Sequence, residues 1–230
     1  MSPTSPAPYV STRPPIVRTP LRTEVRRLLL TGLLRGDPPP GSGINEAELA
    51  ARLGVSRTPL REALLDLERE GMIAIAPGRG FSVQPLTTKD AEEIYPLLAT
   101  LEAMALSRIS SHTPARLKEL ERLNERLATA SGDGEHALAL DGEWHATLLA
   151  DSTNRRLLGL IQTLKNQAYR YEFAFMSYSG KVISSVRQHR DIVRTLRRKD
   201  LDEACALLRS NWVASLEFLR PWLAQRERAS

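Results

Sequence analysis

Three side chains in the second half of the sequence are of types that bind divalent metal ions. Asp141 and His145 lie four residues apart in LDGEWHATLLA, a spacing that places both on one face of a helix. His189 follows in RQHRDIVRTL, on a later predicted helix. Imidazole nitrogens and a carboxylate that meet from facing helices can hold a divalent metal. By spacing alone such a pair is more often an ordinary surface pair, so both interpretations stay open here.

A second group combines arginines with hydroxyl side chains in AELAARLGVSRTPLREALLDLEREGMI. It stands at the start of a predicted helix and consists of Ser56, Arg57, Thr58 and Arg61. Arginine is suited to bidentate contact with guanine, and hydroxyls bind bases or phosphates. The amino terminus of a helix also favours a phosphate. Isolated arginines are mostly solvated helix charges, so contact with DNA depends on the elements that surround this group.

Residues that begin and end helices predict those elements along residues 20–86. Asn45 and Glu48 have the spacing of a helix amino-terminal cap, and Gly54 suits a left-handed helix end. The short runs MIAIA and FSVQ flank the turn PGRG and predict a hairpin, in which Gly78 permits close approach and Arg79 can enter a narrow minor groove. The order helix, helix, tight turn, helix, hairpin predicts a winged helix-turn-helix. The first helix is expected to turn these residues inward: Leu21, Val25, Leu28 and Leu29.

The chain after Thr87 shows no convincing strand and is predicted to be helical throughout. Thr87 begins a helix to about residue 111, and Thr113 caps the next. Further helices are predicted at about 136–150, 154–177, 180–199 and 201–226. Six helices with short loops predict an antiparallel bundle over residues 87–230. The predicted fold class is therefore mainly α. Residues 1–19, which are rich in proline, serine and threonine, are predicted to form a flexible arm before the first helix.

Bulk composition narrows the class of protein. The formal net charge of +5 permits a polyanionic partner without requiring one. The single cysteine, Cys205, excludes an intrachain disulfide and is predicted to be a small core residue. No apolar run approaches the ~18 residues of a membrane span, and the first residues lack the apolar stretch of a signal peptide. A cytoplasmic protein without membrane contact is expected.

Residues 21–83 resemble the DNA-binding domain of GntR-family regulators. The resemblance rests on Gly43-Ile44, on Glu46 with Leu49-Ala50, on GVSRTPLREAL at 54–64, on LEREG at 67–71 and on GRGFSV at 78–83. It implies base and phosphate contacts from Ser56, Arg57, Thr58 and Arg61, and minor-groove contact near Gly78.

The helical remainder resembles the FCD ligand-binding domain of FadR-type members of that family. Many FCD domains hold a metal with one aspartate and three histidines, and the matching motifs here are DGEWH, with Asp141 and His145, and QHRDIVRTLRRKD, with His189. Asn211 stands where the third histidine is expected. The resemblance therefore implies a divalent metal such as zinc or nickel on three protein ligands, with Asn211 as a candidate effector ligand.

The same resemblance points to a carboxylate effector. Many relatives have an arginine at the position of Leu98, which would anchor such an effector, and Arg170 is a candidate substitute. The implied function is a bacterial, homodimeric transcription regulator, expected to be a repressor, that binds an inverted-repeat operator. An effector bound in the bundle would reorient the winged domains about residues 85–88.

Two other classes of function compete with this one. A metalloenzyme could use the same aspartate and histidines, but a hydrolytic site needs a general base beside the metal-bound water. Glu143, two residues after Asp141, points to another helix face, so the sequence favours a non-enzymatic protein. The other alternative is a structural DNA-binding protein without an effector, which would show no ligand-dependent thermal shift.

Overall fold

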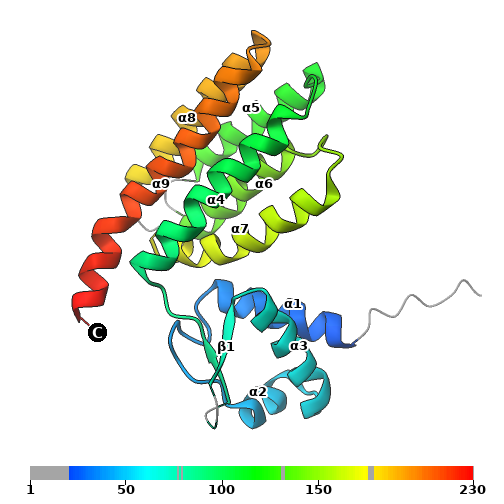
Figure 1. Cartoon of the computed structure of the whole chain (residues 1–230), viewed down its shortest axis with the longest axis vertical. Coiled ribbons are helices and arrows are strands. Elements are labelled where there is room, and N and C mark those ends of the chain that lie inside the picture. Colours follow the sequence, from blue (N-terminus) through cyan, green and yellow to red (C-terminus); the bar gives the residue numbers. More distant parts are fainter. Residues whose placement is uncertain (1–20, 77, 79, 131–132, 176–178, 230) are drawn as a thin grey trace, which may run out of the picture.

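A computed structural model of the chain describes residues 21–229 except 77, 79, 131–132 and 176–178. Two bodies follow one another along the chain (Figure 1), a small head that ends at Val83 and a helical domain that begins at Thr88. The arm predicted for residues 1–19 and the wing residue Arg79 lie outside the described residues.

The head has the predicted element order. Its elements are α1 (Leu21–Leu34), α2 (Glu46–Leu53), α3 (Arg57–Arg69), β1 (Ile73–Ala76) and β2 (Gly80–Val83). The Asn45 side chain accepts hydrogen bonds from the backbone of Ala47 and Glu48, which caps α2 as predicted. Gly54 ends α2 with a φ of 65°, where a side chain would be strained. The winged helix-turn-helix is thus confirmed.

One prediction for α1 is wrong in part. Leu21 and Leu28 were expected to face inward, but they are 56% and 41% exposed. The buried residues are Val25, Leu29 and Leu33, which recur every four positions. Within the head, α1 packs against α3, so a narrow stripe of side chains is enough to close the core.

The wing is an antiparallel hairpin of β1 and β2. Ile73 lies opposite Val83 and Ile75 opposite Phe81 in its register. Phe81 and Val83 are buried in the head core, and a bridge from Gly43 to Ser82 ties the segment before α2 to the wing. The hairpin therefore has a fixed position beside α2 and α3.

The helical domain contains six helices among the described residues. They are α4 (Thr88–Ser107), α5 (Pro114–Thr129), α6 (Gly134–Leu148), α7 (Arg155–Phe175), α8 (Ser179–Arg197) and α9 (Leu201–Ala229). Side-chain caps begin several of them: Thr87 accepts from Asp90, and Asp200 accepts from Glu203. The predicted all-helical bundle is confirmed, and Cys205 is buried within its core as predicted.

The packing of the bundle defines where a ligand site can form. α4 runs along α9, while α5 packs against both α6 and α8 (Figure 1). α7 lies at the edge of the bundle nearest the head and contacts α1. Within the described residues, none of the helices combines the length and apolar character that crossing a membrane requires.

Candidate DNA-binding face and ligand centre

The start of α3 is exposed and faces the wing. Arg57, Thr58 and Arg61 are exposed, and they line an open groove together with the first residues of α2 and Gly80 of the wing. Ser56 occupies the cap position with extended backbone, and among the described residues its side chain makes no capping hydrogen bond. The helix amino terminus, its hydroxyls and its arginines are thus presented on one surface of the head, as recognition of DNA requires.

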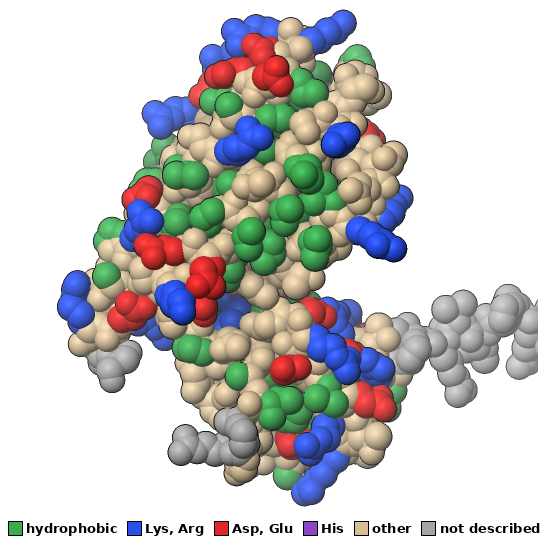
Figure 2. All heavy atoms as spheres, in the orientation of Figure 1, with side chains coloured by type: hydrophobic (Ala, Val, Ile, Leu, Met, Phe, Trp, Pro, Cys, Tyr) green, Lys and Arg blue, Asp and Glu red, His purple; other side chains and the backbone are tan. Residues whose placement is uncertain are grey.

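Arg61 is held in place at this surface. Its guanidinium lies 3.6 Å from the Glu46 carboxylate and 5.7 Å from the centre of the Phe81 ring. These contacts orient the guanidinium while leaving 65% of the side chain exposed. Gly78, in the turn of the wing, is also exposed and has a φ of 72°. Figure 2 shows Lys and Arg side chains on the head interspersed with Asp and Glu side chains, so its charge on this face is mixed.

The predicted metal ligands come together inside the helical domain. Asp141 and His145 on α6 and His189 on α8 each offer a ligand atom within 4.8 Å of the others. The Nε2 atoms of His145 and His189 lie 3.8 Å and 3.6 Å from the two carboxylate oxygens of Asp141. Both histidines are buried, with 2% and 0% of their side chains exposed. Two ligands of α6 and one of α8 therefore converge on a single point.

Glu102 on α4 decides which nitrogen of His145 carries the proton. Burial favours a raised pKa of the Glu102 carboxyl, but its interactions with His145 and Lys165 outweigh burial and lower the pKa to about 2. The ionised carboxylate can only accept hydrogen bonds, and it lies 2.7 Å from Nδ1 of His145. Nδ1 therefore donates to Glu102. Nε2, the other ring nitrogen, faces the Asp141 carboxylate.

His189 is neutral, because desolvation lowers its pKa to about 3. Its Nε2 atom is buried and has no hydrogen-bond partner among the described residues. The ring of Trp144 stacks on His189 in parallel, with 3.6 Å between ring centroids. Nε2 of His145, the buried Nε2 of His189 and the Asp141 carboxylate thus face one another, an arrangement that a cation between them would stabilise. These residues fit a divalent metal.

A cavity of about 470 Å³ opens beside this centre. Its lining combines apolar residues of α6 and α7 with Asp141, His145 and Trp212. Lys165 contributes a positive charge to the lining and lies 3.5 Å from Glu102. The metal centre and a space for a small molecule are therefore continuous.

Comparison with known proteins accounts for both bodies. The profile of the bacterial regulatory proteins of the GntR family matches residues 21–83, and that of the FCD domain matches residues 93–213. The Nta operon transcriptional regulator of Aminobacter aminovorans is 35% identical over 174 residues, which cover 74% of this chain and 80% of that protein. The chain belongs to the GntR family and carries an FCD domain. GntR-family proteins are transcription regulators and not enzymes, which removes the metalloenzyme alternative.

Other relatives agree with this membership. The HTH-type transcriptional repressor RspR of Escherichia coli is 25% identical over 186 residues, which cover 80% of this chain and 82% of that protein. A solved structure of E. coli McbR/YncC superposes with a TM-score of 0.78 at 24% identity, covering 89% of this chain and 99% of that one. The similarity to the McbR/YncC structure shows that the two proteins have a common fold.

Two residues proposed from sequence as effector ligands lie outside the cavity of this GntR-family protein. Asn211 is buried, and its amide donates to Gln188 of α8. The next residue, Trp212, lines the cavity instead, because one step along a helix turns the side chain by about 100°. The role predicted for Asn211 as an effector ligand stays a prediction, and this cavity does not support it.

The effector role predicted for Arg170 also stays a prediction, since Arg170 does not line this cavity. It is buried where the FCD domain meets the head, and its guanidinium donates to the backbone carbonyl of Gln84. Two cations of the same helix do line the cavity, Arg155 and Lys165, and the sequence analysis singled out neither of them. Lys165 stands in the polar stretch QTLKNQ, and nothing in that local pattern distinguishes a cavity-lining lysine from a solvated one.

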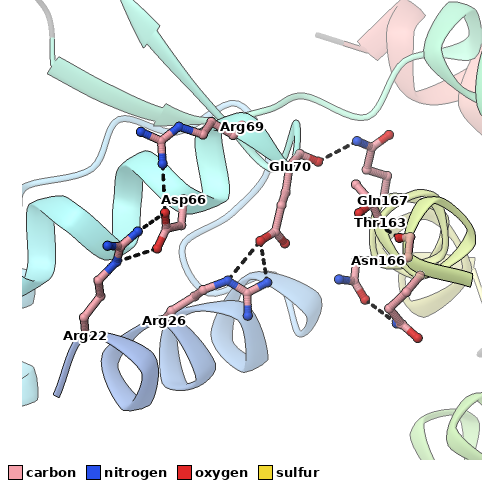
Figure 3. A network of polar contacts seen from close by, with 10 residues as sticks. Arg22, Arg26, Asp66, Arg69, Glu70, Thr163, Asn166 and Gln167 are labelled. Carbon is pink, nitrogen blue, oxygen red and sulfur yellow. Dashed lines mark hydrogen bonds and ion pairs between the residues drawn. The ribbon is translucent and has the colours of Figure 1, made fainter. Parts of the chain in front are cut away.

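α7 holds the head of the GntR-family protein by polar contacts to main-chain atoms. Figure 3 shows the Gln167 amide, which donates to the carbonyl of Glu70 at 2.6 Å, and the Glu70 side chain, which pairs with Arg26 of α1. The Tyr171 hydroxyl accepts from the backbone of Thr87. The neighbouring α7 residues Lys165 and Asn166 line the cavity. One helix therefore contacts both the ligand space and the DNA-binding head.

Gly71 is the tightest point of this junction. It has a φ of 71°, and a Cβ atom there would lie 2.5 Å from the Gln167 side-chain nitrogen. We expect Gly71→Ala to lower the free energy of unfolding by ~1–3 kcal/mol, since left-handed backbone alone costs ~1–2 kcal/mol for a residue with a side chain. Thermal unfolding measures this effect.

Gly159→Ala is the control, because Gly159 lies in α7 with open space around it and alanine favours a helix. Adding Gln167→Ala to Gly71→Ala should recover the part of the loss that comes from the clash. An unchanged melting temperature in Gly71→Ala would contradict the close packing of the head on α7.

Proposed function

We propose that this GntR-family regulator is a homodimeric repressor of an inverted-repeat operator, and that a divalent metal and a carboxylate effector bound in the FCD domain control its affinity for DNA. The observation that carries the proposal is the convergence of Asp141, His145 and His189 at the wall of a cavity. Helix α7 lines that cavity and also holds the DNA-binding head.

The DNA contacts in this proposal come from the start of α3 and from the wing. Ser56, Arg57, Thr58 and Arg61 would enter the major groove, where arginine reads guanine and hydroxyls bind bases or phosphates. Gly78 would bring the wing close to the minor groove, and Arg79 is predicted to insert there. The exposure of the α3 residues on one surface supports these assignments.

The metal in this proposal is zinc, nickel or a similar divalent ion held by Asp141, His145 and His189. Two imidazoles and one carboxylate are a donor set that such ions accept, and three protein ligands leave a position for an outside ligand. The ion would supply a positive charge that attracts the oxygen of a carboxylate. The side chain of Asn211 donates a hydrogen bond to Gln188, so the proposed site has three protein ligands and Asn211 is not a fourth.

The effector class follows from the cavity lining. Lys165 offers a second positive charge near the metal centre, and its side chain is 17% exposed to the cavity region. Leu158, Ile161 and Trp212 supply apolar walls. A small organic acid with an apolar portion matches such a lining, with its carboxylate near the metal and Lys165.

The homodimer would form through the helical domain. Leu97 and Met104 of α4 are 50% and 46% exposed, and Figure 2 shows apolar side chains gathered on the face where α4 runs. A second copy of the chain is the occupant that suits an inverted repeat, because two-fold symmetry of the protein matches that of the operator. The repressor assignment is supported by the name of the relative RspR.

Control of DNA binding would pass through α7. An effector changes DNA affinity only if it binds two conformations of the protein unequally. Lys165 and Asn166 on the cavity side of α7 are next to Gln167, whose amide holds the carbonyl of Glu70 in the head. A ligand that shifts α7 would therefore change the orientation of the head about residues 85–88.

The test is operator binding by fluorescence anisotropy, on a site selected from random DNA, with nickel and a panel of organic acids that includes lactate, malate and citrate. We expect one acid to change the affinity of the wild-type protein by about tenfold, within the usual range for allosteric coupling. Lys165→Met should lose that response because the anchor for the carboxylate is gone, while its affinity without acid stays within about twofold of wild type.

Lys118→Met, an exposed lysine of α5, serves as the matched control and should respond as the wild-type protein does. A wild-type protein that binds the operator equally with every acid, with no ligand-dependent thermal shift, would indicate a DNA-binding protein without an effector. An unchanged response in Lys165→Met would reject Lys165 as the anchor.

A further inference from the structure

Asn124 of α5 lies behind the metal centre. It is buried, with 6% of its surface exposed, and the predicted ligands are on other helices, α6 and α8. Its side chain joins two groups of α8: the amide nitrogen is 2.9 Å from the carbonyl oxygen of Val186, and the amide oxygen is 3.2 Å from Nδ1 of His189. Asn124 therefore contacts the edge of the His189 ring that faces away from Asp141.

The chemistry of these contacts fixes the position of a proton. A backbone carbonyl only accepts hydrogen bonds, so the amide nitrogen of Asn124 must be the atom that faces Val186. The amide oxygen then faces His189 and can only accept, so Nδ1 of His189 carries the hydrogen. A neutral imidazole has one N–H group. The lone pair of His189 is therefore on Nε2, the buried atom 3.6 Å from Asp141.

The stacked ring of Trp144 cannot make this choice. It lies parallel to the His189 ring, with 1° between the planes, and so fixes the plane of the imidazole. A half-turn of the ring about its bond to Cβ keeps the same plane but moves both nitrogens to other edges. The hydrogen bond with Asn124 distinguishes the two orientations at one edge of the ring, and the 3.6 Å approach of Nε2 to Asp141 does so at the other.

We propose that Asn124 is a positioning residue that selects the orientation and the tautomer of His189 and thereby presents Nε2 to a metal ion. The metal part of this inference rests on the proposed function. Glu102 has the matching role for His145, which donates its Nδ1 hydrogen to that carboxylate. Both rings are then set before an ion arrives, which matters more in a site with three protein ligands than in one with four.

The test compares Asn124→Leu, which removes both hydrogen bonds at similar volume, with Asn124→Asp, which keeps an acceptor for Nδ1. The metal-free proteins, labelled with isotopes in histidine, are examined by long-range nitrogen–proton NMR. Nickel binding is followed by quenching of tryptophan fluorescence, because Trp144 stacks on His189. Glu125→Ala, an exposed residue of the same helix, is the control.

We expect wild-type His189 to carry its proton on Nδ1 and Asn124→Leu to lose that state. Nickel affinity should fall by about 10–100-fold in Asn124→Leu, the usual loss when a group that orients a metal ligand is removed. Asn124→Asp should restore most of the affinity. Circular dichroism and operator binding show whether each variant is folded.

The outcomes separate the inference from the proposed function. If the wild-type protein binds no nickel or zinc, the metal is rejected, and the NMR result alone decides whether Asn124 selects the tautomer. If the wild-type protein binds nickel and Asn124→Leu binds it equally well with the proton still on Nδ1, the positioning role is overturned. Loss of affinity in both variants with an unchanged tautomer would also overturn it, since that pattern indicates a merely structural residue.

Discussion

Replacing Arg57 and Arg61 together with alanine is expected to reduce operator affinity at least about thirtyfold. Each arginine that reads a base is worth ~1–3 kcal/mol, and the two project from successive turns of α3. The loss should be larger for the operator than for random DNA, because base contacts carry sequence discrimination while phosphate contacts do not. Fluorescence anisotropy with both DNAs at one fixed salt concentration measures the two losses.

Arg122→Ala is the matched control for this pair. Arg122 is an exposed arginine of α5 that pairs with Glu119, far along the chain from the head. It should leave the affinity within about twofold, as surface substitutions away from a binding site usually do. Normal operator binding by the double variant would show that α3 is not the recognition helix.

Loss of the metal is the second large effect. The wild-type protein should hold about one nickel or zinc ion per chain after loading and dialysis, whereas His189→Ala and Asp141→Asn should hold none. An ion at a hundred times its dissociation constant stabilises the folded state by ~2.7 kcal/mol, so the thermal shift on adding metal should also disappear. Elemental analysis gives the metal content, and a thermal scan with and without the ion gives the stabilisation.

Two controls isolate the site. His136→Ala removes an exposed histidine of the same helix, and Glu143→Gln removes an exposed carboxylate two residues from Asp141. Both should retain the ion, and operator binding without effector should survive in all four variants. If metal content is the same in His189→Ala and His136→Ala, the ion is bound elsewhere or not at all.

Local signals predicted the head well. Asn45 and Gly54 act within a few residues of their own positions, so their effects on the backbone can be read from the sequence. Leu28 was misplaced because its periodicity suits more than one face, and packing against α3 selected the stripe that contains Leu33. The role predicted for Arg79 stays a prediction.

The residues of the ligand centre likewise fall into those that local sequence predicts and those that only helix packing brings together. The four-residue spacing of Asp141 and His145 is a property of one helix, and resemblance to the FCD domain supported joining them with His189 of a later helix. Glu102, Lys165 and Trp212 reach the centre from three different helices, and their meeting depends on how those helices are packed. Asn211, which the resemblance to the FCD domain suggested for the site, donates instead to Gln188, a contact that depends on helix packing.

The junction on α7 has a consequence for exchanging DNA specificity between regulators. The contacts from Gln167, Arg170 and Tyr171 go to main-chain atoms, at Glu70 of the head and at Gln84 and Thr87 of the segment that joins the head to the helical domain. Main-chain atoms are common to any winged domain of the same backbone shape, whatever bases it reads. A foreign head that keeps a glycine at position 71 could thus be grafted onto this sensor and still report the same molecule at a new promoter.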